Sequence, residues 1–136
     1  MRSRIVSLCM VVGVAVVFYF SWIPEPRLGL SNYVPAWLSA WTDKDTNMNL
    51  RTAIPFVFLG LLVAVWLLRT HQPWYQWVTG WLLLVAVVVI AEAGQLLLPL
   101  RHFDWGDIGW GAAGAAAGLL PCFLVYTLVR LTKIAH

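Results

Sequence analysis

Four long apolar runs divide the chain, and shorter polar segments separate them. The runs extend over residues 5–23, 53–68, 74–98 and 108–129. A helix that crosses the hydrocarbon core needs about 20 apolar residues, and only helices or closed barrels satisfy their backbone hydrogen bonds in lipid. No run has the alternating pattern of a barrel strand. The pattern therefore predicts an all-α membrane protein with four transmembrane helices, forming a single domain over residues 1–136.

The polar segment between the first two runs contains a shorter helical pattern. Pro24, Pro26 and Pro35 exclude one continuous helix. Apolar residues with helical spacing are nevertheless present: Val34, Trp37, Leu38 and Trp41. Because tryptophan is enriched at headgroup depth, we expect a short interfacial helix in this first outer loop. Thr52 is then the expected N-cap of the second span, with Pro55 in its first turn.

Charged residues indicate how the spans are oriented. Arg2 and Arg4 precede the first run, so the positive-inside rule places the N-terminus in the cytoplasm, and four spans give an N-in/C-in topology. Five basic residues fall inside: Arg2, Arg4, Arg69, Arg130 and Lys133. Four fall outside: Arg27, Lys44, Arg51 and Arg101. All six acidic residues map to the outer side or outer half: Glu25, Asp43, Asp45, Glu92, Asp104 and Asp107. The purely basic inner face suits an anionic leaflet, so membrane lipids are expected partners.

Composition agrees with this class and narrows the chemistry. Of the 136 residues, 61% are hydrophobic and 11% charged, with a mean hydropathy of +0.78, outside the range of soluble domains. The net charge of +3 is not gathered into a basic run, so nucleic acid is not an expected partner. Cys9 and Cys122 give neither a disulfide framework nor a zinc spacing. His102 lies near carboxylates without a known ligand spacing, so we expect no metal and no cofactor.

One ionisable residue interrupts the third run. Glu92 lies about six residues before the end of that run, roughly 9 Å below the outer surface. A carboxylate at the centre of a bilayer costs on the order of 3 kcal/mol or more, so Glu92 should face the bundle interior and have a partner. Arg101 is the first candidate, followed by Arg51 and Lys44. Gln95 shares the face of Glu92. Glu92 is interpreted either as part of a functional site or as the acid of a structural ion pair, with Gln95 as an interhelical hydrogen-bonding partner.

The loop after the third run holds the other candidate site residues. The planar guanidinium of Arg101 suits a phosphate or a carboxylate, although a salt bridge to Glu92 or Asp104 is an alternative. Asp107 is well placed to cap the fourth helix, and Asp104 could cap it one turn earlier. Together Glu92, Gln95, Arg101, Asp104 and Asp107 form the expected ligand-binding set. No catalytic residue is assigned, because no nucleophile–base pair is evident.

Small residues line one face of the fourth run. Gly111, Gly114 and Gly118 are spaced for close helix packing, and Gly114 and Gly118 form a GxxxG motif. We expect this face to pack against the third span, with homodimerisation through the same face as an alternative. Pro121 lies within the run and is expected to kink the helix.

The motif residues resemble those of a known family. Glu92-x-x-Gln95, Arg101-x-x-Asp104-x-x-Asp107 and Gly114-x-x-x-Gly118 resemble the signature of the VanZ-like family of small bacterial membrane proteins, although Gly111 stands where the family has asparagine. Asp43-Lys44 and Leu59-Gly60 resemble earlier positions of the family, so the resemblance covers residues 43–120.

The resemblance implies a multi-pass protein of the bacterial inner (cytoplasmic) membrane and of the cell envelope. The founding member of the family is associated with low-level glycopeptide resistance, and the family supplies no reaction.

Three functions follow as hypotheses. The first is an envelope protein that binds an anionic or lipid-linked ligand at the outer cluster. The second is an accessory subunit packed in a larger membrane complex, which nine tryptophans and the small-residue face motivate. The third is an enzyme acting on a lipid head group, with Glu92 or Asp104 as general base.

Overall fold

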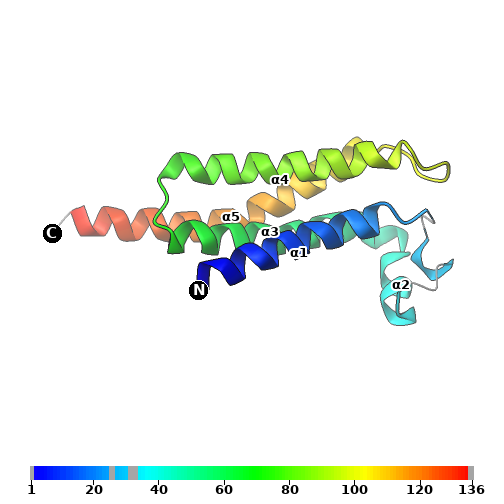
Figure 1. Ribbon diagram of the computed structural model, residues 1–136, viewed down its shortest axis with the longest axis horizontal. Coiled ribbons are helices and arrows are strands. Elements are labelled where there is room, and N and C mark those ends of the chain that lie inside the picture. The colour runs from blue at the N-terminus through cyan, green and yellow to red at the C-terminus, as the bar shows by residue number, and fades with distance from the viewer. Residues whose placement is uncertain (1, 25–26, 31–33, 135–136) are drawn as a thin grey trace.

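A computed structural model describes residues 2–24, 27–30 and 34–134 of the chain (Figure 1). The expected outer position of Glu25 lies outside these residues. The regular elements of the described part are all helical, and they are α1 (Arg2–Ser21), η1 (Leu28–Leu30), α2 (Ala36–Thr42), η2 (Asp45–Asn47), α3 (Met48–Arg69), α4 (Trp74–Gln95) and α5 (Trp105–Ile134).

Four of these helices are long and apolar enough to cross a membrane. They are α1, α3, α4 and α5, and each contains a window of mean hydropathy between 1.9 and 2.1. The short helix α2 follows the first of them. The predictions of a four-span helical membrane protein and of a short helix between the first two spans are therefore confirmed. The first turn of α1 and the last turn of α5 lie toward one end of the bundle, whereas α2 lies at the other (Figure 1).

Helices α3 and α5 extend beyond the apolar runs that predicted them. Helix α3 begins at Met48 rather than near residue 53, so Thr52 is not an N-cap and Pro55 lies in the helix interior. Residues 48–52 contain no proline and therefore continue the helix ahead of its apolar run. Helix α5, with 30 residues, likewise extends at both ends beyond residues 108–129.

Helix α4 ends earlier than expected, at Gln95 rather than at residue 98. Pro99 disfavours a helical conformation at the residue before it. The amides of Leu96 and Leu97 instead donate turn-type bonds to Ala93 and Gly94. Glu92 therefore lies about one turn from the end of its helix, roughly 4.5 Å along the axis.

The core forms where α3 crosses α5, the most extensive contact between any two helices described. Gly114 and Gly118 lie against backbone atoms of α3, at Ala53 and Val57, so an added Cβ would strike a carbonyl oxygen. Gly111 alone faces α4, through Val88. The expectation that the whole glycine face packs on the third span, α4, is thus wrong for Gly114 and Gly118. These two residues pack on the second span, α3. Homodimerisation through this face stays a prediction, and it would require α3 to separate from α5.

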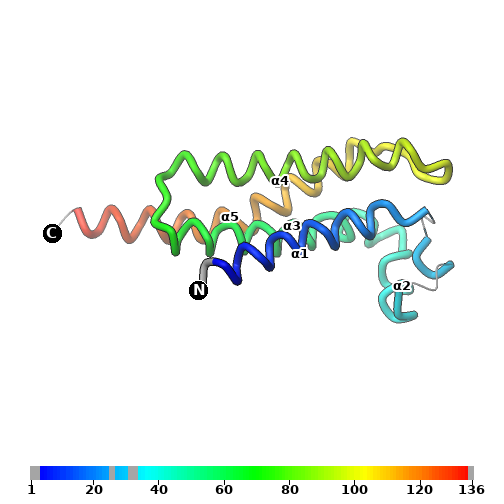
Figure 2. Tube along the Cα trace, in the orientation of Figure 1, coloured from blue at the N-terminus to red at the C-terminus, as the bar shows by residue number. Residues whose placement is uncertain are grey.

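Helix α1 packs loosely beside the other helices. Figure 2 shows it alongside α3, and only 6% of its membrane-length window is buried. Figure 2 also shows that α5 changes direction along its length. Pro121 lies within this helix and removes the backbone bond to Ala117, as a kink requires.

Candidate functional site

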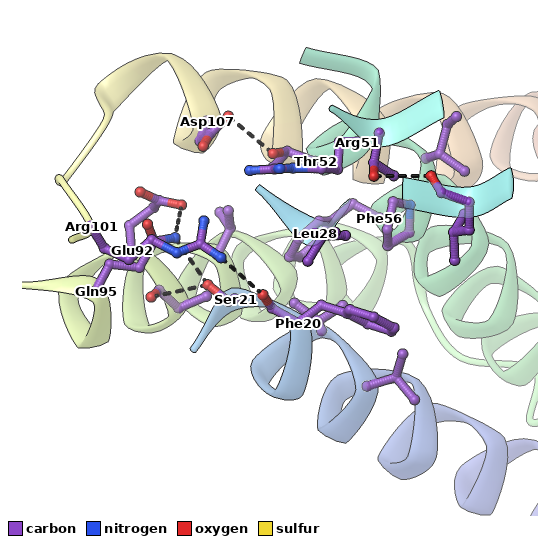
Figure 3. A pocket seen from close by; sticks show the side chains of 18 of the residues that line it. Phe20, Ser21, Leu28, Arg51, Thr52, Phe56, Glu92, Gln95, Arg101 and Asp107 are labelled. Carbon is purple, nitrogen blue, oxygen red and sulfur yellow. Dashed lines mark hydrogen bonds between the residues drawn. The ribbon is translucent and has the colours of Figure 1, made fainter. Parts of the chain in front are cut away.

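Glu92 is the centre of a hydrogen-bonded cluster at the α2 end of the bundle. Its side chain is 2% exposed, which confirms that it faces the interior. Oε1 accepts a hydrogen bond of 2.9 Å from the Gln95 amide, and Oε2 accepts one of 3.2 Å from the backbone N–H of Asp104. Both carboxylate oxygens are therefore satisfied by amide donors, and Figure 3 shows Glu92 beside Gln95.

Gln95 connects this cluster to α1. Its Nε2 also donates to Oγ of Ser21 at 3.0 Å, which confirms the expected interhelical hydrogen bond. Ser21 Oγ and Trp22 Nε1 both donate to the carbonyl of Ala91, at 3.3 Å and 3.1 Å. The C-terminal end of α1 is consequently fixed on α4 by polar contacts.

Arg101 is buried beside the same end of α1. Its Nε donates to the carbonyl of Ile23 at 3.0 Å, and its Nη2 lies 3.5 Å from the carbonyl of Phe20. The last carbonyls of a helix lack partners within it, and a cation there is favourable. Burial lowers the pKa of the Arg101 guanidinium, as Arg51 also does, whereas Glu92 and Asp107 act in the opposite direction. The hydrogen bonds to α1 show that Arg101 stabilises the end of that helix, a role that the sequence did not indicate.

The two aspartates of the loop have different positions from those first expected. Asp104 precedes α5, and its Oδ1 accepts a hydrogen bond of 2.7 Å from the amide of Gly106, as an N-cap does. Asp107 lies inside the first turn of α5, where its Oδ1 accepts a bond of 3.0 Å from Thr52 of α3. Capping by Asp107 is therefore wrong, and the alternative, capping by Asp104, is confirmed. Asp107 is already inside the helix, in its first turn, and its hydrogen bond to Thr52 connects α5 to α3.

A cavity of about 280 Å³ lies beside this cluster. Its apolar lining includes Val16, Phe20, Leu28, Leu38, Trp41, Ile54, Phe56, Val88 and Ala91. Its polar lining consists of Ser21, Thr42, Arg51, Thr52, Glu92, Gln95, Arg101 and Asp107. Four of the five expected site residues thus line one cavity, while Asp104 contributes its backbone N–H to Glu92 and its side chain to the helix cap.

Arg51 and Thr52 are cavity residues that the sequence indicated only in part. Arg51 was a candidate partner for Glu92, and Thr52 was expected to be a helix cap. Both lie on the first turns of α3, and the α3–α5 contact brings Thr52 to Asp107, 55 residues further along the chain. Figure 3 shows both labelled residues at the charged end of the cavity. No local spacing signals such a pairing.

Asp43 shapes the cavity from outside. Its carboxylate accepts hydrogen bonds from the amides of Leu28 and Gly29, at 2.9 Å and 2.7 Å. These bonds hold η1 against the end of α2, and Leu28 is buried in the cavity wall. The only signal for Asp43 in the sequence was its place in the Asp43-Lys44 pair.

Within the described residues, no three His, Cys, Asp or Glu side chains are grouped as the ligands of a metal ion would be. Comparison of the chain with protein-family models, with curated proteins and with solved structures finds no match. Fold and site together define the class: a four-span helical membrane protein with a cavity that is charged at one end and apolar along its walls.

Proposed function

We propose that this membrane protein binds a lipid-linked ligand through an anionic head group. The supporting observation is that one cavity combines two guanidiniums, of Arg51 and Arg101, with apolar walls from α1, α2, α3 and α4. Arginine is well suited to phosphate because its donors form a planar fork. Apolar walls suit the hydrocarbon that follows a lipid phosphate, at about 0.8 kcal/mol for each buried methylene.

The cavity size limits how much of a lipid it holds. A volume of about 280 Å³ lies near the lower end of small-molecule pockets, which hold roughly 300–1,000 Å³. The head group and the first part of a chain fit this space, and the rest of the chain would extend into the bilayer along α1. With the N-in/C-in orientation predicted from the basic residues, the ligand enters from the outer leaflet.

We extend the proposal to membership in the VanZ-like family and to the bacterial inner membrane. Its support is that Glu92, Gln95, Arg101 and Asp107, four residues of the resemblance, line the same cavity. An accessory subunit and a lipid head-group enzyme stay predictions. Co-purification of a second chain after mild solubilisation would favour the former, and turnover of labelled lipid by the purified protein would favour the latter.

Binding of tail-matched lipids tests the proposed function. The purified protein in detergent is titrated with dioleoyl phosphatidic acid and with dioleoylglycerol, which lacks the phosphate, and binding is measured by native mass spectrometry. We expect the phosphate lipid to bind and the neutral lipid to bind at least about tenfold more weakly, because hydrogen bonds to charged groups contribute about 1.5–3 kcal/mol. Equal binding of the two lipids would contradict the proposal.

Two variants with matched controls locate the binding. Arg51→Gln should weaken phosphatidic acid binding about tenfold, whereas Arg69→Gln, on the last turn of α3 at the opposite end, should not.

Ala91 is buried in the cavity wall and Ala93 is exposed on the same helix. Ala91→Leu should therefore block binding and Ala93→Leu should leave it intact. Loss of binding in both members of either pair would place the ligand elsewhere.

A further inference from the structure

The charged end of the cavity carries both signs of charge, and this bears on the head group that it accepts. Arg51 and Arg101 supply positive charge, while Glu92 and Asp107 supply negative charge. A site for a purely anionic head group gains nothing from carboxylates in its lining, because like charges repel strongly where water is scarce. The two carboxylates therefore need separate explanations.

Glu92 is accounted for by the protein itself. Both of its oxygens accept amide hydrogen bonds, from Gln95 and from the backbone of Asp104, and the side chain is 2% exposed. It is thus a structural anchor for the end of α4 and for the loop that follows.

Asp107 is different, because the protein satisfies only part of its carboxylate. It is half-buried in the cavity lining, and its Oδ1 accepts from Thr52 at 3.0 Å. Among the described residues, this is the one hydrogen bond of the Asp107 side chain, so Oδ2 keeps its capacity to accept. The guanidiniums of Arg51 and Arg101 lie in the same lining and favour the charge of this carboxylate, but Oδ2 can still accept a hydrogen bond from a further donor. Figure 3 shows Asp107 across the charged end of the cavity from Arg101, with Arg51 beside Thr52.

We propose that the ligand is a zwitterionic aminophospholipid, with its phosphate on the guanidinium side and a primary ammonium on Asp107. This inference rests on the proposed function and adds the amine to it. An ammonium brings three donors and no acceptor, which complements an incompletely satisfied carboxylate. In an ethanolamine head group two carbons separate the ammonium from the phosphate. Asp107 accepts a hydrogen bond from Thr52, and Arg51 lies in the same cavity lining, close enough to act electrostatically on the Asp107 carboxylate.

A head-group series with constant dioleoyl chains tests the amine. Phosphatidylethanolamine carries the primary ammonium, phosphatidylglycerol keeps the phosphate without an amine, and phosphatidylcholine carries a cation without N–H donors. We expect the ethanolamine lipid to bind about tenfold more tightly than the other two, because one charge-assisted hydrogen bond distinguishes them. Water-soluble phosphoethanolamine, which lacks the chains, should bind far more weakly than the lipid.

Asp107→Asn should remove the preference, because the amide oxygen still accepts from Thr52 but carries no charge, and phosphatidylglycerol should bind more tightly because a like charge has been removed. Asp45→Asn is the matched control, since Asp45 is exposed at the same end of the bundle and outside the cavity, and it should keep the preference. Equal affinity for the three lipids, or a preference that survives in Asp107→Asn, would contradict recognition of the ammonium by Asp107 while leaving the proposed function standing. Binding of water-soluble phosphoethanolamine as tightly as the lipid would contradict the inference that the ligand is a lipid. Absence of binding by every phospholipid would overturn both proposals.

Discussion

The buried carboxylate of Glu92 is satisfied by amide donors rather than by an opposite charge alone. Glu92 accepts from Gln95 and from the Asp104 backbone, and Gln95 reaches Ser21 of α1. A network of this kind leaves no acceptor of Glu92 unused at a place where water is scarce. Hydrogen bonds of Glu92 and Gln95 consequently connect three segments: α1, α4 and the loop before α5.

Replacement of Glu92 should therefore destabilise the fold. In Glu92→Leu the donors of Gln95 and Asp104 lose their acceptor, at about 1–3 kcal/mol for each buried donor. Glu92→Gln keeps one acceptor oxygen and should lose less. Thermal unfolding in detergent should rank the native protein first, Glu92→Gln second and Glu92→Leu last. A Leu variant as stable as the native protein would mean that this network contributes nothing.

The sequence gives good reason to place Glu92 inside the bundle but not to identify its partners. The cost of a charge in lipid dictates the burial, whatever the neighbouring residues are. The partners depend on how residues 96–104 fold, and the early end of α4 at Gln95 decides this. That end brings the Asp104 amide to Glu92 and directs Arg101 toward α1 instead.

Among the elements, α1 depends most on contacts at one end. Few of its residues are buried, whereas its C-terminal turn is held by Arg101, Gln95 and Trp22. The same turn forms one wall of the cavity through Phe20 and Ser21. Attachment of α1 and the shape of the cavity are therefore linked.

Arg101→Ala should loosen this end of α1. The carbonyls of Phe20 and Ile23 lose a charged donor, and a loss of about 1.5–3 kcal/mol corresponds to roughly tenfold or faster local opening. Hydrogen–deuterium exchange should rise at the C-terminal turn of α1 and stay unchanged in α3. Arg69→Ala, at the other end of the bundle, serves as the control. Unchanged exchange at α1 in Arg101→Ala would show that the remaining contacts suffice.

Helices α3 and α5 cross with their backbones in close contact. Two glycines of α5 separate the effect of this close packing on stability from the effect of helix propensity. A Cβ on Gly118 would meet backbone atoms of Val57 and Leu61, which no side-chain rotation relieves, whereas a Cβ on Gly109 meets open space. Gly118→Ala should destabilise by about 1–3 kcal/mol, as overpacking does. Gly109→Ala should be neutral or stabilise by up to about 1 kcal/mol. Chemical unfolding of the two variants measures the difference, and equal stabilities would contradict close packing at Gly118.

For the whole molecule, the number of spans follows from the apolar runs because lipid requires about 20 apolar residues for each crossing. The set of residues that line the cavity does not follow from the apolar runs in the same way. Arg51 and Thr52 lie on α3, far in sequence from Asp107, and only the α3–α5 crossing places them together. The GxxxG motif indicates that α5 packs closely, but its spacing does not specify which helix it meets.

The orientation of the bundle decides which leaflet supplies the cavity. The first turn of α1 and the last turn of α5 lie toward one end of the bundle, and α2 with the cavity lies at the other. Arg2 and Arg4 predict that the first of these ends faces the cytoplasm. In a variant with Cys9 and Cys122 replaced by alanine, Asp45→Cys should react with a membrane-impermeant maleimide in intact spheroplasts. Thr132→Cys, near the end of α5, should react only after permeabilisation. The opposite labelling pattern would place the cavity on the cytoplasmic side, and its lipid would then come from the inner leaflet.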